Sequence, residues 1–188
     1  MRIYQCIHKY PPHIPAFEKR WGIGRHSTFA EIHDALLRDG YASVYRLIPP
    51  RDRPEDEVFF TVWNYERLQY AWAREQGLSL SCLNDIRLAQ IEDFQPDVVY
   101  DFSSFVSPKF AEMLRQRFSG PILAWNGYIK EEDPPVDPAY SAYVSLHRPF
   151  VESWKKRGYK ALGLSDDVPA LDDTPERADP EDTEQQRF

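Results

Sequence analysis

Cysteine is scarce in this sequence of 188 residues, which contains only Cys6 and Cys82. Two thiols cannot form a disulfide framework, nor a metal site without further ligands. Both lie among apolar residues, so we expect buried free thiols. His13 and His26 have no cysteine or carboxylate at metal-ligand spacing, so no metal site is predicted. The start of the chain is too short and polar for a signal peptide, and a cytoplasmic location is the default expectation.

Long apolar runs are also absent, and the mean hydropathy is −0.61. A membrane-spanning helix needs about 20 consecutive apolar residues, so no span is predicted. The sequence has no Walker A phosphate loop and no Gly-x-Ser-x-Gly elbow, and neither cysteine lies beside an obvious base. These absences argue against a hydrolase and leave a small complete nucleotide-dependent enzyme without support.

The body of the chain lacks an excess of charge of either sign. The formal net charge is −7, but residues 165–188 hold nine acidic residues and two arginines, which leaves 21 basic and 21 acidic residues in residues 1–164. A neutral body without a basic stripe argues against nucleic acid as a partner. Residues 165–188 have few apolar side chains, so we expect an acidic disordered tail or an interdomain linker there.

What the sequence does contain is an alternation of strand-like and helix-like segments over residues 1–164. This pattern is typical of a parallel sheet with helices on its faces. It predicts an α/β fold: one Rossmann-like, doubly wound, mostly parallel sheet of about six strands with helices on both faces. The expected strands are residues 2–7, 41–48, 98–102, 122–126, 143–146 and 159–164. The expected helices begin near residues 28, 81, 108 and 149.

Two segments allow more than one interpretation. Apolar residues recur at helical spacing over residues 57–76, but residues 58–63 are also compatible with a short strand followed by a helix capped by Asn64. Residues 8–26 are predicted to form a long loop with three prolines. In it, Gly22 and Gly24 precede a capped helix, where backbone N–H groups could surround an anion. The alternative is that these glycines only shape a turn, because the third glycine of a dinucleotide-binding loop is missing.

Polar residues follow several of the expected strands. Ligands of open parallel sheets bind beyond the carboxyl ends of the strands. His8 ends the first strand, where a general base is well placed to accept a proton from a substrate hydroxyl. Asp101 could orient such a histidine or act as the base itself. The other candidate ligand contacts are Gly22, Gly24, Trp125, Asn126, His147 and Arg148. Each of these residues also has an ordinary structural role as the alternative.

Three stretches of the sequence resemble a known group of enzymes. They are His8-Lys9-Tyr10-Pro11-Pro12 with Trp21-Gly22-Ile23-Gly24-Arg25-His26, residues 90–100, and Ser145-Leu146-His147-Arg148-Pro149-Phe150 through residue 161. They are similar to the N-terminal domain of bacterial GT-B glycosyltransferases of the spore-maturation (CgeB-like) group. The resemblance spans roughly residues 1–165.

The resemblance implies a two-domain enzyme in which a C-terminal domain holds a nucleotide-sugar donor. The N-terminal domain would bind a sugar or another glycosylatable acceptor, with His8 or Asp101 matching the side-chain base. No cofactor is expected in this chain itself. The 188 residues lack the donor-binding domain, so the acceptor-binding half is expected to be inactive alone. The alternative is a stand-alone binding or regulatory module with the same fold.

Overall fold

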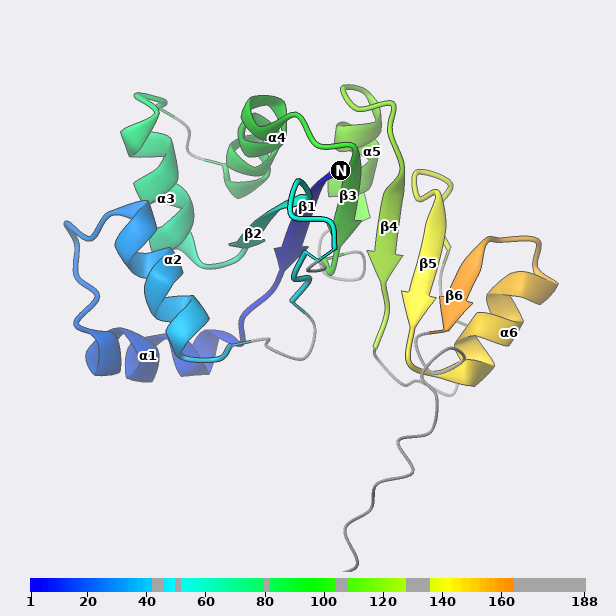
Figure 1. Cartoon of the computed structure of the whole chain (residues 1–188), viewed down its shortest axis with the longest axis horizontal. Coiled ribbons are helices and arrows are strands. Elements are labelled where there is room, and N and C mark those ends of the chain that lie inside the picture. The colour runs from blue at the N-terminus through cyan, green and yellow to red at the C-terminus, as the bar shows by residue number, and fades with distance from the viewer. Residues whose placement is uncertain (42–45, 50–51, 80–81, 104–107, 128–135, 164–188) are drawn as a thin grey trace, which may run out of the picture.

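A computed structural model describes residues 1–41, 46–49, 52–79, 82–103, 108–127 and 136–163. Six strands form one all-parallel sheet in the order β2-β1-β3-β4-β5-β6 (Figure 1). The strands are β1 (Arg2–Ile7), β2 (Glu57–Val62), β3 (Val98–Asp101), β4 (Ile122–Trp125), β5 (Ala142–Ser145) and β6 (Ala161–Gly163). The predicted fold class, a Rossmann-like parallel α/β domain, is confirmed.

Helices pack on both faces of this sheet. On one face, α4, α5 and α6 contribute to an apolar core with the inward side chains of β1, β3, β4 and β5. On the other, α1, α2 and α3 pack their apolar residues over β1 and β2 (Figure 1). The bounds are α1 (Ile14–Trp21), α2 (Phe29–Arg38), α3 (Glu66–Glu75), α4 (Leu83–Phe94), α5 (Pro108–Arg115) and α6 (Arg148–Lys156), with a 3₁₀ turn at Pro11–His13.

The prediction of a strand over residues 41–48 is wrong at the residues of this segment that the structure describes. Residues 42–45 lie outside the described residues, and residues 46–49 are irregular. There the Leu47 amide donates to the side chain of Gln5 in β1 instead of joining a strand ladder. The strand that pairs with β1 is β2, which was the alternative for residues 58–63. Asn64 does not cap α3, because Tyr65 occupies the N-cap position.

The expected loop over residues 8–26 contains a helix, α1, which the sequence analysis missed. One of the three prolines of this segment, Pro15, lies in the first turn of α1. A proline is tolerated there because the amide it lacks has no partner within the helix. Gly22 then ends α1 in the left-handed conformation, with φ of 66°. The helix predicted near residue 28 is confirmed, with Thr28 and Glu31 forming a capping box at its start.

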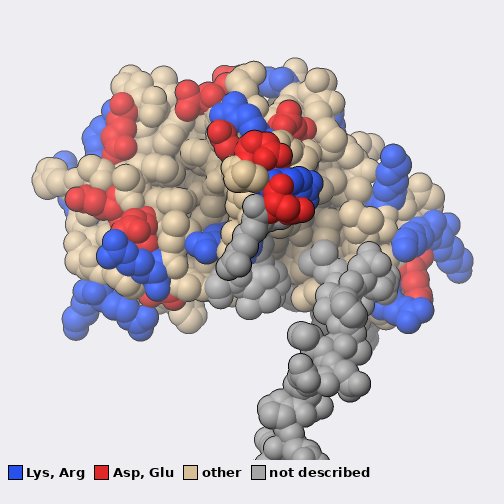
Figure 2. Space-filling view, viewed as in Figure 1, with Lys and Arg blue, Asp and Glu red and all other residues tan. Residues whose placement is uncertain are grey.

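Charges of both signs are interspersed over one face of the molecule (Figure 2). On the face shown in Figure 2, lysines and arginines alternate with aspartates and glutamates, and neither sign forms a continuous stripe. Within the described ranges, no helix is long and apolar enough to cross a membrane.

Candidate functional site

The strand order reverses between β1 and β3, which lie side by side as the second and third strands of the sheet. β2 lies beside β1 on one side, and β4 to β6 continue from β3 on the other. In sheets of this kind the crevice beyond the carboxyl ends of the two central strands is the usual ligand site. His8 and Lys9 directly follow β1, and Ser103 lies just beyond β3. We call this region the switch-point edge.

His8 lies at the switch-point edge with one ring nitrogen uncommitted. The residue is half-buried, and its Nδ1 atom is buried without a hydrogen-bond partner. Its backbone carbonyl accepts a hydrogen bond from the Tyr41 hydroxyl. Tyr10 lies edge-on to the imidazole, with 5.6 Å between ring centroids. The backbone is therefore fixed, while Nδ1 has no hydrogen-bond partner.

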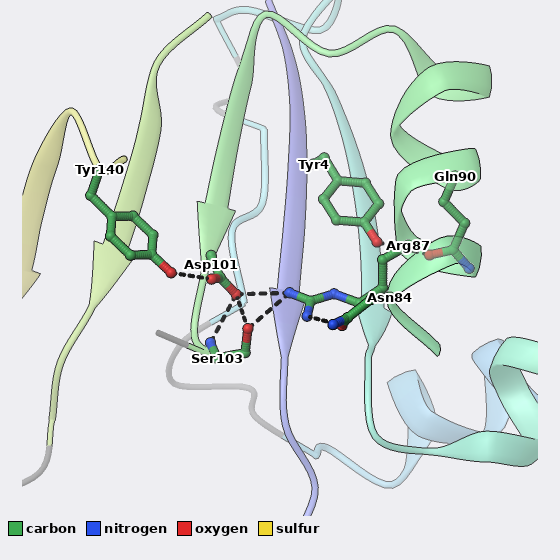
Figure 3. A network of polar contacts seen from close by, with 7 residues as sticks. All are labelled: Tyr4, Asn84, Arg87, Gln90, Asp101, Ser103 and Tyr140. Carbon is green, nitrogen blue, oxygen red and sulfur yellow. Dashed lines mark hydrogen bonds and ion pairs between the residues drawn. The ribbon is translucent and has the colours of Figure 1, made fainter. Parts of the chain in front are cut away.

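Asp101 is brought to the same edge, but its carboxylate is fully buried and fully engaged. Oδ1 accepts from the Arg87 guanidinium at 3.0 Å and from the amide and hydroxyl of Ser103 at 2.8 and 2.6 Å (Figure 3). Oδ2 accepts from the Tyr140 hydroxyl at 2.7 Å. Burial and the nearby carboxylate raise the pKa of Tyr140 well above its ordinary value, so this hydroxyl stays a donor. The geometry gives Asp101 a positioning role at the end of β3.

Arg87 is the partner that sequence analysis missed. Its guanidinium reaches from α4 across the end of β1 to Asp101 and Ser103, as Figure 3 shows from the opposite side of the sheet to Figure 1. It stacks on Phe110 of α5, with its central carbon 3.3 Å from the ring centroid. The cation is fully buried and its charge is compensated by Asp101. The ion pair thus joins α4 to β3 beside the switch-point edge, and the stacking on Phe110 adds α5.

Lys9 is a second residue whose role was not predicted. Only 2% of it is exposed, and its ammonium lies 4.2 Å from the Phe17 ring centroid and 4.0 Å from that of Tyr41. The Asn64 side chain holds its backbone through two hydrogen bonds, accepting from the Lys9 amide at 2.7 Å and donating to its carbonyl at 2.6 Å. Burial lowers the pKa of the Lys9 amine, although the charge of Asp39 opposes the shift.

The predicted glycine site is not part of the switch-point edge. The Gly24 amide donates to the Ser27 hydroxyl, and the amide of Phe29, at the start of α2, donates to Glu75 at the end of α3. Since α3 runs back from the carboxyl end of β2, its last residue lies near the opposite, amino end of the sheet (Figure 1). With Glu31 also closing the capping box, two carboxylates occupy the place predicted for an anion.

The remaining predicted contacts follow β4 and β5. Trp125 is 8% exposed and stacks on Phe102 at 5.1 Å between ring centroids, so it packs in the core and its faces are covered. Asn126 is buried beyond β4, where its amide donates to the Val144 carbonyl. His147 precedes α6 with its ring edge-on to Phe150. Arg148 is exposed and paired with Glu152 at 2.9 Å.

The two cysteines differ in accessibility, which corrects the expectation that both are buried. Cys6 is buried in β1, whereas Cys82 is exposed at the start of α4. Burial raises the pKa of the Cys6 thiol to about 12, although the neighbouring Arg87 guanidinium opposes the shift. At pH 8 such a thiol is ionised in about one chain in 10,000, and only the thiolate reacts.

We therefore expect Ellman's reagent at pH 8 to modify one thiol per folded chain and two in denaturant. A Cys82→Ser variant should lose the rapid reaction, and a Cys6→Ser variant should keep it. Equal rates for both thiols in the folded chain would contradict the burial of Cys6. Because the raised pKa holds this proton in the folded state, its contribution to stability is complete below the ordinary value of 9.0 and is lost towards pH 12.

Among its described residues, the switch-point edge has no signature of a known class of site. In the described part of the chain, no three His, Cys, Asp or Glu side chains gather as a metal-binding group. No protein-family model, no curated protein and no solved structure matches the chain. The edge offers a half-buried histidine, a buried lysine and a buried Arg–Asp pair.

Proposed function

We propose that the switch-point edge binds a sugar or another hydroxyl-bearing acceptor, and that the chain is the acceptor-side half of a nucleotide-sugar-dependent glycosyltransferase. The observation that supports this most directly is His8. It directly follows β1 at the switch point, and its Nδ1 is buried without a hydrogen-bond partner. A histidine held by its backbone with a free ring nitrogen suits a general base that takes a proton from an acceptor hydroxyl.

In this proposal the residues have separate tasks. His8 accepts the proton of the attacking hydroxyl. Asn64 holds the Lys9 backbone, and the Tyr41 hydroxyl binds the His8 carbonyl, so two hydrogen-bonding groups fix the segment that carries the base. Asp101 and Arg87 keep the end of β3 in place beside it. The donor is assigned to a separate C-terminal domain, because the Gly24 turn and the start of α2 are occupied by protein groups.

The test measures the binding of sugars and nucleotide sugars to the chain alone. The same measurement is then repeated on the His8→Gln variant. We expect simple sugars of the acceptor type to bind, and nucleotide sugars to bind only once a donor-binding domain is supplied. His8→Gln should weaken sugar binding about 10-fold, as the loss of one hydrogen bond predicts. The matched control is His13→Gln, in the exposed 3₁₀ turn. Titration calorimetry gives both affinities. Donor binding by the isolated chain, or equal effects of the two variants, would argue against the proposal.

A stand-alone binding module is the second candidate, and the state of Asp101 favours it. Its carboxylate has four donors already, so it is not available as a second acid or base next to His8. The glycosyltransferase half and the binding module differ in whether the bound sugar is glycosylated. Mixing the chain with a candidate donor-binding domain, a nucleotide sugar and the bound sugar should release the nucleotide if the first is right. If the chain binds the sugar but no candidate donor-binding domain leads to nucleotide release, the result supports the binding module.

A further inference from the structure

The switch-point edge presents one exposed aromatic ring, that of Tyr10. Within the described ranges only two aromatic side chains are exposed, Tyr10 at 64% and Tyr70 of α3 at 37%. Tyr10 is the third residue after β1, and its ring centroid lies 5.6 Å from that of His8. The more exposed of the two rings therefore lies directly beside the imidazole to which we assign the proton transfer.

The backbone of Tyr10 is held in place by its neighbours. Its φ of −66° and ψ of 117° are extended values, which are favoured in a residue that precedes a proline, here Pro11. Its carbonyl accepts a hydrogen bond from the His13 amide at 3.0 Å, which closes the 3₁₀ turn. The preceding residue, Lys9, is fixed by its two hydrogen bonds with Asn64. A side chain on a fixed backbone loses less conformational entropy on binding than one on a free loop.

The surroundings of the Tyr10 ring leave most of it open. The planes of Tyr10 and His8 are 77° apart, and the His13 centroid lies 6.2 Å from that of Tyr10 with 59° between the planes. Neither imidazole is parallel to the Tyr10 ring, so neither is stacked on it. With nearly two thirds of the residue exposed, the ring has room for a flat apolar partner.

His8 has one ring nitrogen at the surface beside this ring. Nδ1 is buried, so it is not the atom that a ligand meets. Nε2 makes no hydrogen bond within the described part of the chain and is not one of its buried atoms without a partner, so it is exposed to solvent. A hydroxyl held over Tyr10 therefore approaches Nε2, which accepts a proton when the imidazole is neutral.

The chemistry of Tyr10 and His8 favours a sugar in its ring form. A pyranose has faces made of C–H bonds and a rim of hydroxyl groups. The C–H bonds of such a face are slightly positive and pack on the negative face of an aromatic ring. The tyrosine hydroxyl can also donate to, or accept from, a hydroxyl of the sugar. An open-chain alcohol offers the same hydroxyls without a rigid apolar face.

We infer that Tyr10 is the surface on which the acceptor stacks, and that the acceptor is a pyranose or pyranoside bound through a C–H face with one hydroxyl at His8 Nε2. This inference rests on the proposed function, since it names the class of acceptor and a residue that selects it. The contact with Tyr10 requires no charge on the ligand.

The experiment compares a ring probe with an open-chain probe on the whole chain by ¹H NMR titration. Methyl β-D-glucopyranoside and glucitol carry similar hydroxyls, but only the glucoside has a rigid ring. We expect the glucoside to bind about 10-fold more tightly than glucitol, as one aromatic stacking contact predicts. Protons above the face of an aromatic ring shift upfield, so the C–H protons of one face of the bound glucoside should move upfield. Saturation transferred from the protein should be strongest at the same protons.

Three variants test the ring itself. Tyr10→Ala should weaken glucoside binding about 10-fold and abolish the upfield shifts. Tyr10→Phe keeps the aromatic face and should bind within about 3-fold of the unaltered chain, because it loses only the hydroxyl. Tyr70→Ala removes the other exposed aromatic ring and should change neither result. Since Tyr10 is mostly exposed, Tyr10→Ala should keep the urea midpoint of the unaltered chain, which separates a lost contact from a lost fold.

The outcomes distinguish the inference from the proposed function. Glucoside binding that Tyr10→Ala leaves unchanged, or equal affinity for the glucoside and glucitol, overturns the inference and leaves the proposed function standing. Glucoside binding that falls in Tyr10→Ala but not in His8→Gln supports stacking on Tyr10 and overturns the role of His8 as the base. Weaker binding in both variants supports both. No binding of either probe overturns both.

Discussion

Replacing Asp101 with asparagine is expected to lower the free energy of unfolding by about 3–5 kcal/mol, because it leaves the buried Arg87 cation without its counter-charge. Asparagine keeps the size of the side chain, so the loss of unfolding free energy comes from the lost charge and hydrogen bonds rather than from a cavity. Both partners are fully buried, and the carboxylate accepts from three residues. Urea unfolding followed by circular dichroism measures the change.

Two controls make this prediction specific. Glu92→Gln breaks an ion pair of the same length, 3.0 Å to Arg117, in which both side chains are about half exposed. It should cost less than about 1 kcal/mol. The double variant Arg87→Met with Asp101→Leu removes both charges together and should recover most of the stability lost in Asp101→Asn. If Asp101→Asn costs no more than Glu92→Gln, the pair does not hold the end of β3.

Phe110→Ala is expected to lower the free energy of unfolding by about 3–5 kcal/mol, the usual cost of removing a buried aromatic ring. Phe110 is fully buried in α5, between the apolar core and the Arg87 guanidinium that stacks on its ring. The substitution therefore creates a cavity and removes a cation–π contact in one step. The loss should appear as a lower urea midpoint with an unchanged slope.

The matched control for Phe110 is an aromatic side chain that packs little. Tyr10 is 64% exposed, and Tyr10→Ala should change the free energy of unfolding by no more than about 0.5 kcal/mol. Phe110→Leu should lie between the two alanine variants, since it keeps part of the buried volume. An effect of Phe110→Ala as small as that of Tyr10→Ala would show that α5 does not pack as described.

The fold was readable from the sequence because short-range signals determine it. Apolar runs closed by Pro, Gly or an acid predicted β3 and β4 within a residue of their observed ends, and the Thr28 and Glu31 spacing predicted the start of α2. The strand predicted over residues 41–48 is wrong at Leu47, whose amide donates to the side chain of Gln5 instead of pairing with a strand backbone. An apolar pattern alone does not show whether a segment pairs with a sheet.

The site was readable only in part, since its decisive contacts join distant residues. His8 and Asp101 were found because they end strands. Arg87 lies in the middle of a helix, where an arginine normally faces water, and only the folded chain brings it to Asp101. Lys9 had no signal of burial, because its two aromatic neighbours come from α1 and from residue 41.

The position of β1 in the sheet also affects how the chain is made. Ile3 pairs with Val58 on one side and with Val98 on the other, so the first strand to leave the ribosome gains its second neighbour only after residue 98 has been made. At ribosomal speeds of about 5–20 residues per second, β1 waits on the order of ten seconds for β3. During that interval its apolar side chains are a target for chaperones that hold extended segments. Synonymous codons that slow translation before residue 98 should therefore lower the yield of folded protein.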